Sequence, residues 1–176
     1  GKINFFGERS IGMYVYLPSH NSNALMTNTG TITLSGKESY GMKFAAAAAT
    51  SGTLRAAMIN DTNATINLQK NASGSDKADQ SAALALMADG SVTGGVSLGT
   101  GKVENKGTIN LKDVENSLGA YVNIASDITN SGKINIDSTI ADGTPTSQAF
   151  NVGMRSGTNA NANVINTGTG TITMDG

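Results

Sequence analysis

The stretch Asn28-Thr-Gly-Thr-Ile-Thr-Leu34 defines the repeat of this chain, because recognisable copies of it return along the whole sequence. The further copies are Asn105–Leu111, Asn130–Ile136, Asn60–Leu68 and Asn166–Met174 (both with a two-residue insertion) and, without the opening Asn, residues 1–5. Behind the Gly, apolar residues alternate with Thr or Asn, and this period of two predicts a β-strand. We expect the Gly to occupy a sharp corner with a positive φ angle.

Two shorter motifs keep a constant phase against this one. The second, Ser-x-(Gly/Ala)-apolar-x-apolar, follows each copy of the first and opens at Ser10, Ser39, Ser81, Ser117 and Ser147. It predicts a second strand, whose inner face would be lined by Met13, Met42, Leu84, Ala120 and Phe150. The third motif is an apolar residue two places before each opening Asn, namely Met26, Met58, Val103, Ile128 and Val164.

Each unit therefore holds three short strands separated by turns. The opening Asn residues are 32, 45, 25 and 36 positions apart. Repeats of paired helices keep a nearly fixed period, whereas stacked strands tolerate loops of variable length at their corners. The sequence predicts an all-β fold, a right-handed parallel β-helix of about five to six coils with variable outward loops.

We expect residues 1–176 to form a single β-helix segment, with coils opening near residues 1, 28, 60, 105, 130 and 166. One inward column would hold Ile3, Ile32, Ile66, Ile109, Ile134 and Ile172, and its neighbour Phe5, Leu34, Leu68, Leu111, Ile136 and Met174. The chain begins and ends inside copies of the repeat. This pattern predicts a fragment of a longer protein, whose uncapped ends would associate end to end.

The recurring Asn residues are interpreted as architecture. Stacked Asn side chains can bond to one another and to turn backbone groups. We expect such a ladder at one corner of the solenoid, formed by Asn28, Asn60, Asn105, Asn130 and Asn166.

Composition narrows the function classes. The net charge is −1, from 12 Lys and Arg against 13 Asp and Glu, and no basic cluster is present, which argues against a nucleic-acid partner. There is no Cys, and the single His is His20, so thiolate and His-based metal sites and a Cys–His nucleophile are excluded. No apolar run is long enough for a transmembrane helix. We expect no catalytic, cofactor-binding or metal-binding residues.

Carboxylates are the candidate catalytic groups, since β-helices can cleave polysaccharides and this reaction needs two acids facing one groove. Most acids fall in expected loops or turns: Asp61, Asp76, Asp79, Asp89, Asp113 and Asp142. Glu8 and Glu38 are expected at equivalent places in successive units, beside Arg9 and Lys37. We interpret them as solvated turn acids, with Glu38 as the residue to substitute in a test for catalysis.

Copies reading Asn-x-Gly-x-Ile-x-Leu and then Ser-x-Gly-Met resemble the passenger regions of large bacterial type V autotransporters, most closely the fusobacterial outer-membrane autotransporter adhesins. Residues 28–42 carry the best match, and the pattern covers essentially the whole chain. The motif Gly is replaced by Ala83 and Ala149, and the motif Met by Ala120 and Phe150. The resemblance implies a β-helical, virulence-associated passenger on the bacterial outer membrane, with its parent anchored by a C-terminal barrel outside this chain.

The leading functional hypothesis is accordingly a non-enzymatic stalk or adhesive segment on the cell surface. Its partner would be a surface protein or glycan of host cells or of other bacteria. A β-helix polysaccharide lyase or hydrolase and a toxin-type passenger are the alternatives. The lack of two acids on one strand face favours the stalk or adhesin.

Overall fold

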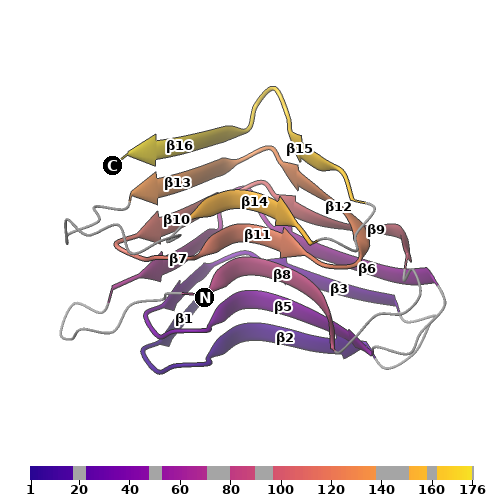
Figure 1. Ribbon diagram of the computed structural model, residues 1–176, viewed down its shortest axis with the longest axis horizontal. Coiled ribbons are helices and arrows are strands. Elements are labelled where there is room, and N and C mark those ends of the chain that lie inside the picture. Colours follow the sequence, from indigo (N-terminus) through magenta and orange to yellow (C-terminus); the bar gives the residue numbers. More distant parts are fainter. Residues whose placement is uncertain are drawn as a thin grey trace.

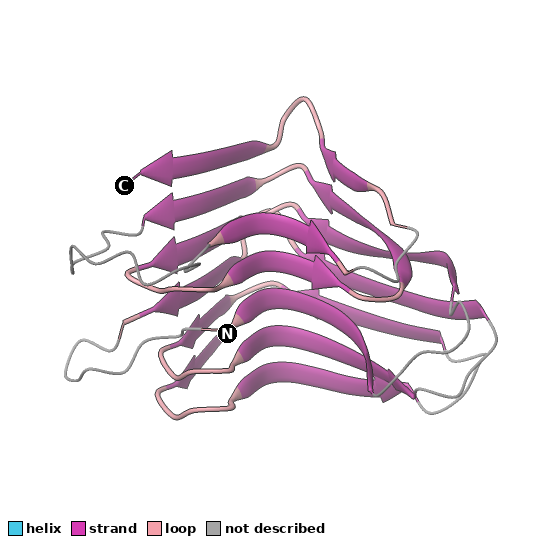
Figure 2. Ribbon diagram, viewed as in Figure 1, coloured by secondary structure: helices cyan, strands magenta, loops and turns pink. Residues whose placement is uncertain are grey.

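The computed structural model describes residues 1–17, 23–47, 53–70, 80–89, 97–137, 151–157 and 162–175. These residues form sixteen strands wound into a solenoid, and they contain no helix (Figures 1 and 2). No helix long and apolar enough to span a bilayer occurs among the described residues. The predicted all-β parallel β-helix is confirmed.

Three parallel sheets run along the solenoid, with every third strand in the same sheet. Sheet A contains β1 (Lys2–Phe5), β4 (Thr31–Leu34), β7 (Thr65–Gln69), β10 (Thr108–Lys112), β13 (Lys133–Asp137) and β16 (Thr171–Asp175). Sheet B, at the front of Figure 1, contains β2 (Ile11–Leu17), β5 (Tyr40–Ala47), β8 (Ala82–Asp89), β11 (Leu118–Val122) and β14 (Val152–Ser156). Sheet C contains β3 (Asn23–Asn28), β6 (Thr53–Asn60), β9 (Ser97–Asn105), β12 (Ala125–Asn130) and β15 (Val164–Asn166). One strand from each sheet makes a coil, so the described residues form five coils and the first strand of a sixth.

The two inward columns of sheet A are confirmed by its register. Ile3 pairs with Ile32, which pairs with Ile66, and the same column continues through every later strand of the sheet. The four middle members of this column are fully buried: Ile32, Ile66, Ile109 and Ile134. Burying one such side chain stabilises the fold by about 1.5–3 kcal/mol. The column therefore forms one wall of the core along the axis.

The inner face of sheet B follows the second motif in its first four copies but not in the fifth. Met42, Leu84 and Ala120 are buried as expected, and Met13 packs against them. In the last copy Ala120 pairs with Met154, not with Phe150. The true copy is therefore Asn151-Val-Gly-Met154, four residues later than predicted. Residues 147–150 lie outside the described residues.

The Gly of the first motif is required by close approach rather than by its φ angle. A Cβ on Gly107 would lie 2.3 Å from the carbonyl oxygen of Asp61 and 2.4 Å from that of Ala64. None of the first-motif residues Gly30, Gly107, Gly132 and Gly168 has a φ in the left-handed region, so the expected positive φ was wrong. The left-handed residues instead include Arg9, Glu38, Gln80 and Asn116, each directly before the Ser or Asn position that opens the second motif.

Candidate functional site

The five predicted Asn residues form a continuous ladder at the corner between sheets C and A. Each side-chain Nδ2 donates a hydrogen bond to the Oδ1 of the next Asn, at 2.9 Å from Asn28 to Asn60 and at 2.8 Å in the three later steps through Asn105 and Asn130 to Asn166. The same amides also donate to a backbone carbonyl of the next coil, as Asn105 does to Lys133 at 3.1 Å. Because Asn60, Asn105 and Asn130 are at most 1% exposed, they offer no surface to a ligand.

A second ladder joins the Ser residues of the second motif, and sequence reasoning missed it. The backbone N–H of Ser10 donates to Ser39 Oγ at 3.0 Å, and that of Ser39 donates to Ser81 Oγ at 2.9 Å. The series continues to Ser117 and then to Asn151, whose Oδ1 accepts from the Ser117 N–H at 3.0 Å. The recurrence of Ser at one phase was the available signal. Its role is to close the corner between sheets A and B.

A third ladder lies on the outer face of sheet A. Asn135 donates to Asn110 and Asn110 donates to Asn67, both at 2.8 Å, and Asn67 donates to Thr33 Oγ1 at 3.3 Å. Its members alternate with the inward columns of the sheet and are only partly buried. Their amides are nevertheless tied to one another, so this face is a regular polar surface.

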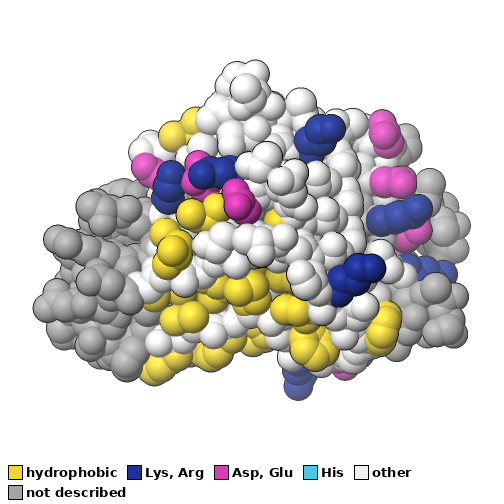
Figure 3. Space-filling view, turned by 180° about the vertical axis from the view of Figure 1, so that it is seen from behind, with side chains coloured by type: hydrophobic (Ala, Val, Ile, Leu, Met, Phe, Trp, Pro, Cys, Tyr) yellow, Lys and Arg dark blue, Asp and Glu magenta, His cyan; other side chains and the backbone are white. Residues whose placement is uncertain are grey.

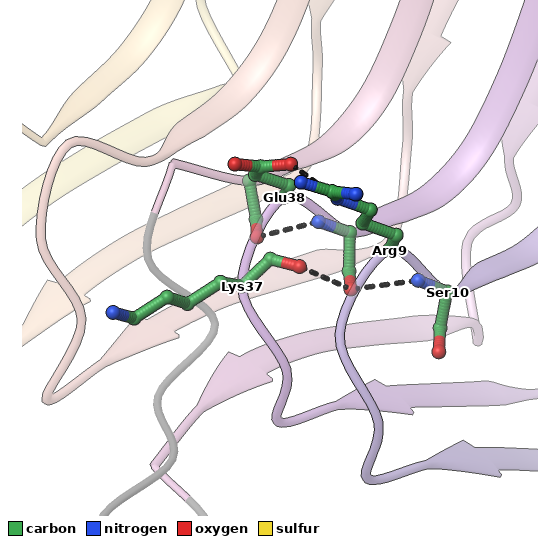
Figure 4. A network of polar contacts seen from close by, with 6 residues as sticks. Arg9, Ser10, Lys37 and Glu38 are labelled. Carbon is green, nitrogen blue, oxygen red and sulfur yellow. Dashed lines mark hydrogen bonds and ion pairs between the residues drawn. The ribbon is translucent and has the colours of Figure 1, made fainter.

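The expected equivalence of Glu8 and Glu38 is wrong. Arg9 and Glu38 are the residues that share the left-handed conformation before the motif Ser, with φ angles of 55° and 54°. Glu38 therefore stacks on Arg9, and Arg9 Nε lies 2.8 Å from Glu38 Oε2 (Figure 4). The hydrogen bond to Glu38 and its charge raise the pKa of Arg9. The stacked pair is an exposed ion pair, not the two facing acids that glycoside hydrolysis needs.

The remaining candidate acids form no site in the part of the chain that the structure describes. Asp61 accepts a hydrogen bond from the backbone N–H of Thr62 at 2.8 Å, and Asp113 is a left-handed turn residue. The positions outside the described residues are Asp76, Asp79, Asp142 and His20, together with the side chain of Asp89. No group of three acids or His residues able to hold a metal ion occurs among the described residues.

Glu104 is the most buried acid of the described residues, at 8% exposed on sheet C. Lys102 Nζ lies 2.9 Å and Lys106 Nζ 3.5 Å from its Oε2. The same oxygen has no well-aligned hydrogen bond, so the contact is an ion pair set by charge. Two lysines place positive charge beside this buried carboxylate, which suits a structural role.

The outer face of sheet B differs from both other faces, because all four tyrosines of the chain lie on it. Tyr14 and Tyr16 alternate with the inward Met13 and Val15 and are 49% and 47% exposed. Tyr121 likewise stands between the buried Ala120 and Val122.

Tyr40 lies on the same side, since Lys43 Nζ sits 4.7 Å from the centre of its ring. Burial raises the pKa of Tyr40, and the charges of Glu38 and Tyr121 add to this effect. Register places Tyr14 beside Lys43 and Tyr121 beside Arg155, in one outward column. We name Tyr14, Tyr16, Tyr40, Lys43, Tyr121 and Arg155 the tyrosine face.

The opposite side of the molecule carries mixed hydrophobic and charged side chains (Figure 3). Its exposed hydrophobic residues include Leu25 of β3, which is 68% exposed. No aromatic residue occurs among the described outward side chains on the strands of sheets A and C. The tyrosine face is therefore the candidate functional surface.

Comparisons with protein-family models, curated proteins and solved structures find no match to this chain. The fold assignment rests on the register of the paired strands, and the surfaces of the solenoid are the basis for a function.

Proposed function

We propose that this chain is a non-enzymatic stalk and adhesive segment of an autotransporter passenger, displayed outside the bacterial outer membrane. The observation that carries the proposal is that the recurring polar residues hold the coils together. The Asn and Ser of the motifs form ladders from coil to coil, so the repeat provides a continuous scaffold. The variable positions are left to face outward, where a partner can reach them.

Several features support a scaffold that holds its shape. Sheet strands stack at about 4.8 Å, so each coil lengthens the rod by roughly that amount. The core is continuous along the axis, from Met26 in the first coil to Ile136 at the start of the fifth. Buried polar groups that are fully paired favour one arrangement of the chain over others. The resemblance of the Asn-x-Gly-x-Ile unit to autotransporter passengers supports the location at the cell surface.

The alternatives of a polysaccharide-cleaving enzyme and a toxin gain no support from the described residues. Glycoside hydrolysis needs two carboxylates about 5–10 Å apart across a groove. Glu38, the acid that the sequence singled out for a test of catalysis, is paired with Arg9. We therefore assign Glu38 a structural role in the turn and not a catalytic role.

The location is tested with antibodies raised against the purified chain. Labelling of intact cells of the source bacterium is expected to equal labelling of permeabilised cells. Signal that appears only after permeabilisation would refute surface display.

Adhesion and catalysis are tested together on the purified chain. Fluorescent chain is expected to bind host epithelial cells or partner bacteria saturably, while a panel of polysaccharides shows no new reducing ends or unsaturated products. The variant Glu38→Gln should bind equally well. Polysaccharide turnover that disappears in Glu38→Gln would establish the enzymatic alternative instead.

A further inference from the structure

The tyrosine face is not explained by the architecture of the solenoid. At the outward positions of sheet B, the third coil carries Ala82 and Ala85 where its neighbours carry Tyr40, Lys43 and Tyr121. The sheet thus accepts alanine at the same positions, so the fold does not require tyrosine there. Tyr14 and Tyr16 keep about half of their surface exposed, so burial alone is a weak reason for placing aromatic rings there.

The described charged side chains of this face are cationic. Among the side chains described on β2, β5, β8, β11 and β14, the charged ones are Lys43 and Arg155. Glu38, at the edge of the face, is neutralised by Arg9 at 2.8 Å. Arg155 is exposed, and Lys43 Nζ lies over the Tyr40 ring. An anionic partner would therefore meet two cations beside aromatic rings.

We propose that the tyrosine face binds an acidic polysaccharide, an inference that rests on the adhesive function proposed above and names its partner. The faces of tyrosine rings carry partial negative charge and stack against the polarised C–H groups of sugar rings. Arg155 and Lys43 pair with the carboxylate or sulfate groups of the glycan. Tyrosine hydroxyls add hydrogen bonds at the rim.

The geometry favours a glycan over a peptide. Extended peptides commonly bind by adding a strand to an exposed sheet edge. In sheet B, β5, β8 and β11 are each paired on both sides, so the middle of the face has no open edge. Side chains alone are presented there, spread over four coils from Tyr14 to Tyr121. An extended polysaccharide lying across the coils contacts these side chains without backbone pairing.

The test measures binding of the whole chain to hyaluronan and chondroitin sulfate, with dextran as the neutral comparator. Binding to the acidic polymers is expected, with little binding to dextran and with affinity falling as salt rises. The double variant Lys43→Ala/Arg155→Ala should bind about tenfold more weakly. The matched control Lys112→Ala/Lys133→Ala removes the same charge from the outer face of sheet A and should bind like the parent.

The aromatic contribution is tested separately. Tyr14→Ser/Tyr16→Ser is expected to weaken binding about tenfold even at high salt, because stacking is not screened. Leu25→Ser removes an exposed hydrophobic side chain from sheet C instead; this variant is the control and should leave binding intact. Circular dichroism and urea unfolding check that each variant is folded.

Each outcome separates this inference from the function it rests on. Equal losses in the two charge variants would mean unspecific attraction and would overturn the proposal. Cell binding that needs the tyrosine face but is abolished by protease treatment of the cells would indicate a protein partner, overturning the glycan and keeping the adhesive function. If the chain binds cells but none of the polysaccharides, the glycan proposal is likewise overturned and the adhesive function is kept. Binding to neither polysaccharides nor cells would refute both.

Discussion

Sheets A and B are wound from the same coils, yet their outer faces differ in kind. On sheet A the middle outward column holds Asn or Thr in every strand, and Asn67, Asn110 and Asn135 hydrogen-bond in a line. On sheet B one outward column changes at every coil, from Tyr14 to Lys43, Ala85, Tyr121 and Arg155. Both sheets keep equally apolar inner faces. Regular outward residues thus belong to the scaffold, and irregular ones are free to vary with a partner.

The largest expected effect comes from the inner column of sheet A. Ile109→Ala removes a fully buried side chain and should lower the free energy of unfolding by about 2–5 kcal/mol, measured by urea titration. Thr108→Ala, its outward and half-buried neighbour, should change it by less than about 1 kcal/mol. Equal effects of the two would break the distinction between inner and outer positions.

The buried Asn ladder should be almost as sensitive. Asn105→Ala leaves the Nδ2 of Asn60 without its acceptor and the Oδ1 of Asn130 without its donor. Each unsatisfied buried group costs about 1–3 kcal/mol, so we expect a loss of roughly 2–4 kcal/mol on urea unfolding. Asn110→Ala, in the outer ladder of sheet A, should cost no more than about 1 kcal/mol. A larger loss at Asn110 would show that the outer ladder supports the fold.

The close approach at the first corner predicts a smaller effect. Gly107→Ala would force its Cβ against two carbonyl oxygens at 2.3 and 2.4 Å and should destabilise the chain by about 1–3 kcal/mol in thermal or urea unfolding. A Cβ on Gly168 meets nothing within 4 Å. Gly168→Ala is thus the control, and it should leave stability unchanged. Tolerance of Ala at both positions would contradict this account of the corner.

The smallest effect on stability is expected on the outer face of sheet B. Arg155→Ala should shift the free energy of unfolding by no more than about 0.5 kcal/mol, because the side chain is exposed. The same variant in combination with Lys43→Ala is the one that should lose acidic polysaccharide. A strong destabilisation by Arg155→Ala would show that this residue supports the fold and is not reserved for a partner.

Sequence reasoning succeeded where the pattern is short-range and repeated. The alternation in residues 28–34 predicted both the strand and its inward column, because inward and outward positions follow from a period of two. It failed in the last coil, where Ser147 matches the second motif in sequence but Asn151 occupies the position of the motif Ser. An Asn Oδ1 can accept the same hydrogen bond as a Ser Oγ, so residue type alone did not settle the register.

The prediction that Glu8 and Glu38 are equivalent failed for a related reason. Glu8 and Glu38 look equivalent when the units are aligned by residue type. The backbone instead aligns Arg9 with Glu38, since both take the left-handed conformation before the motif Ser. One residue of register changes the result from two like charges to an ion pair.

The sequence by itself determined the solenoid, its three strands per coil, and which side chains form the core, because these depend on alternation within a few residues. It also marked the positions of the corner Asn residues. Only the tertiary structure decided that the Ser residues bond from coil to coil, that Glu38 meets Arg9, and that four tyrosines and two cations share one outer face. Those neighbours are separated by a whole coil of chain, and loop length and stacking register bring them together.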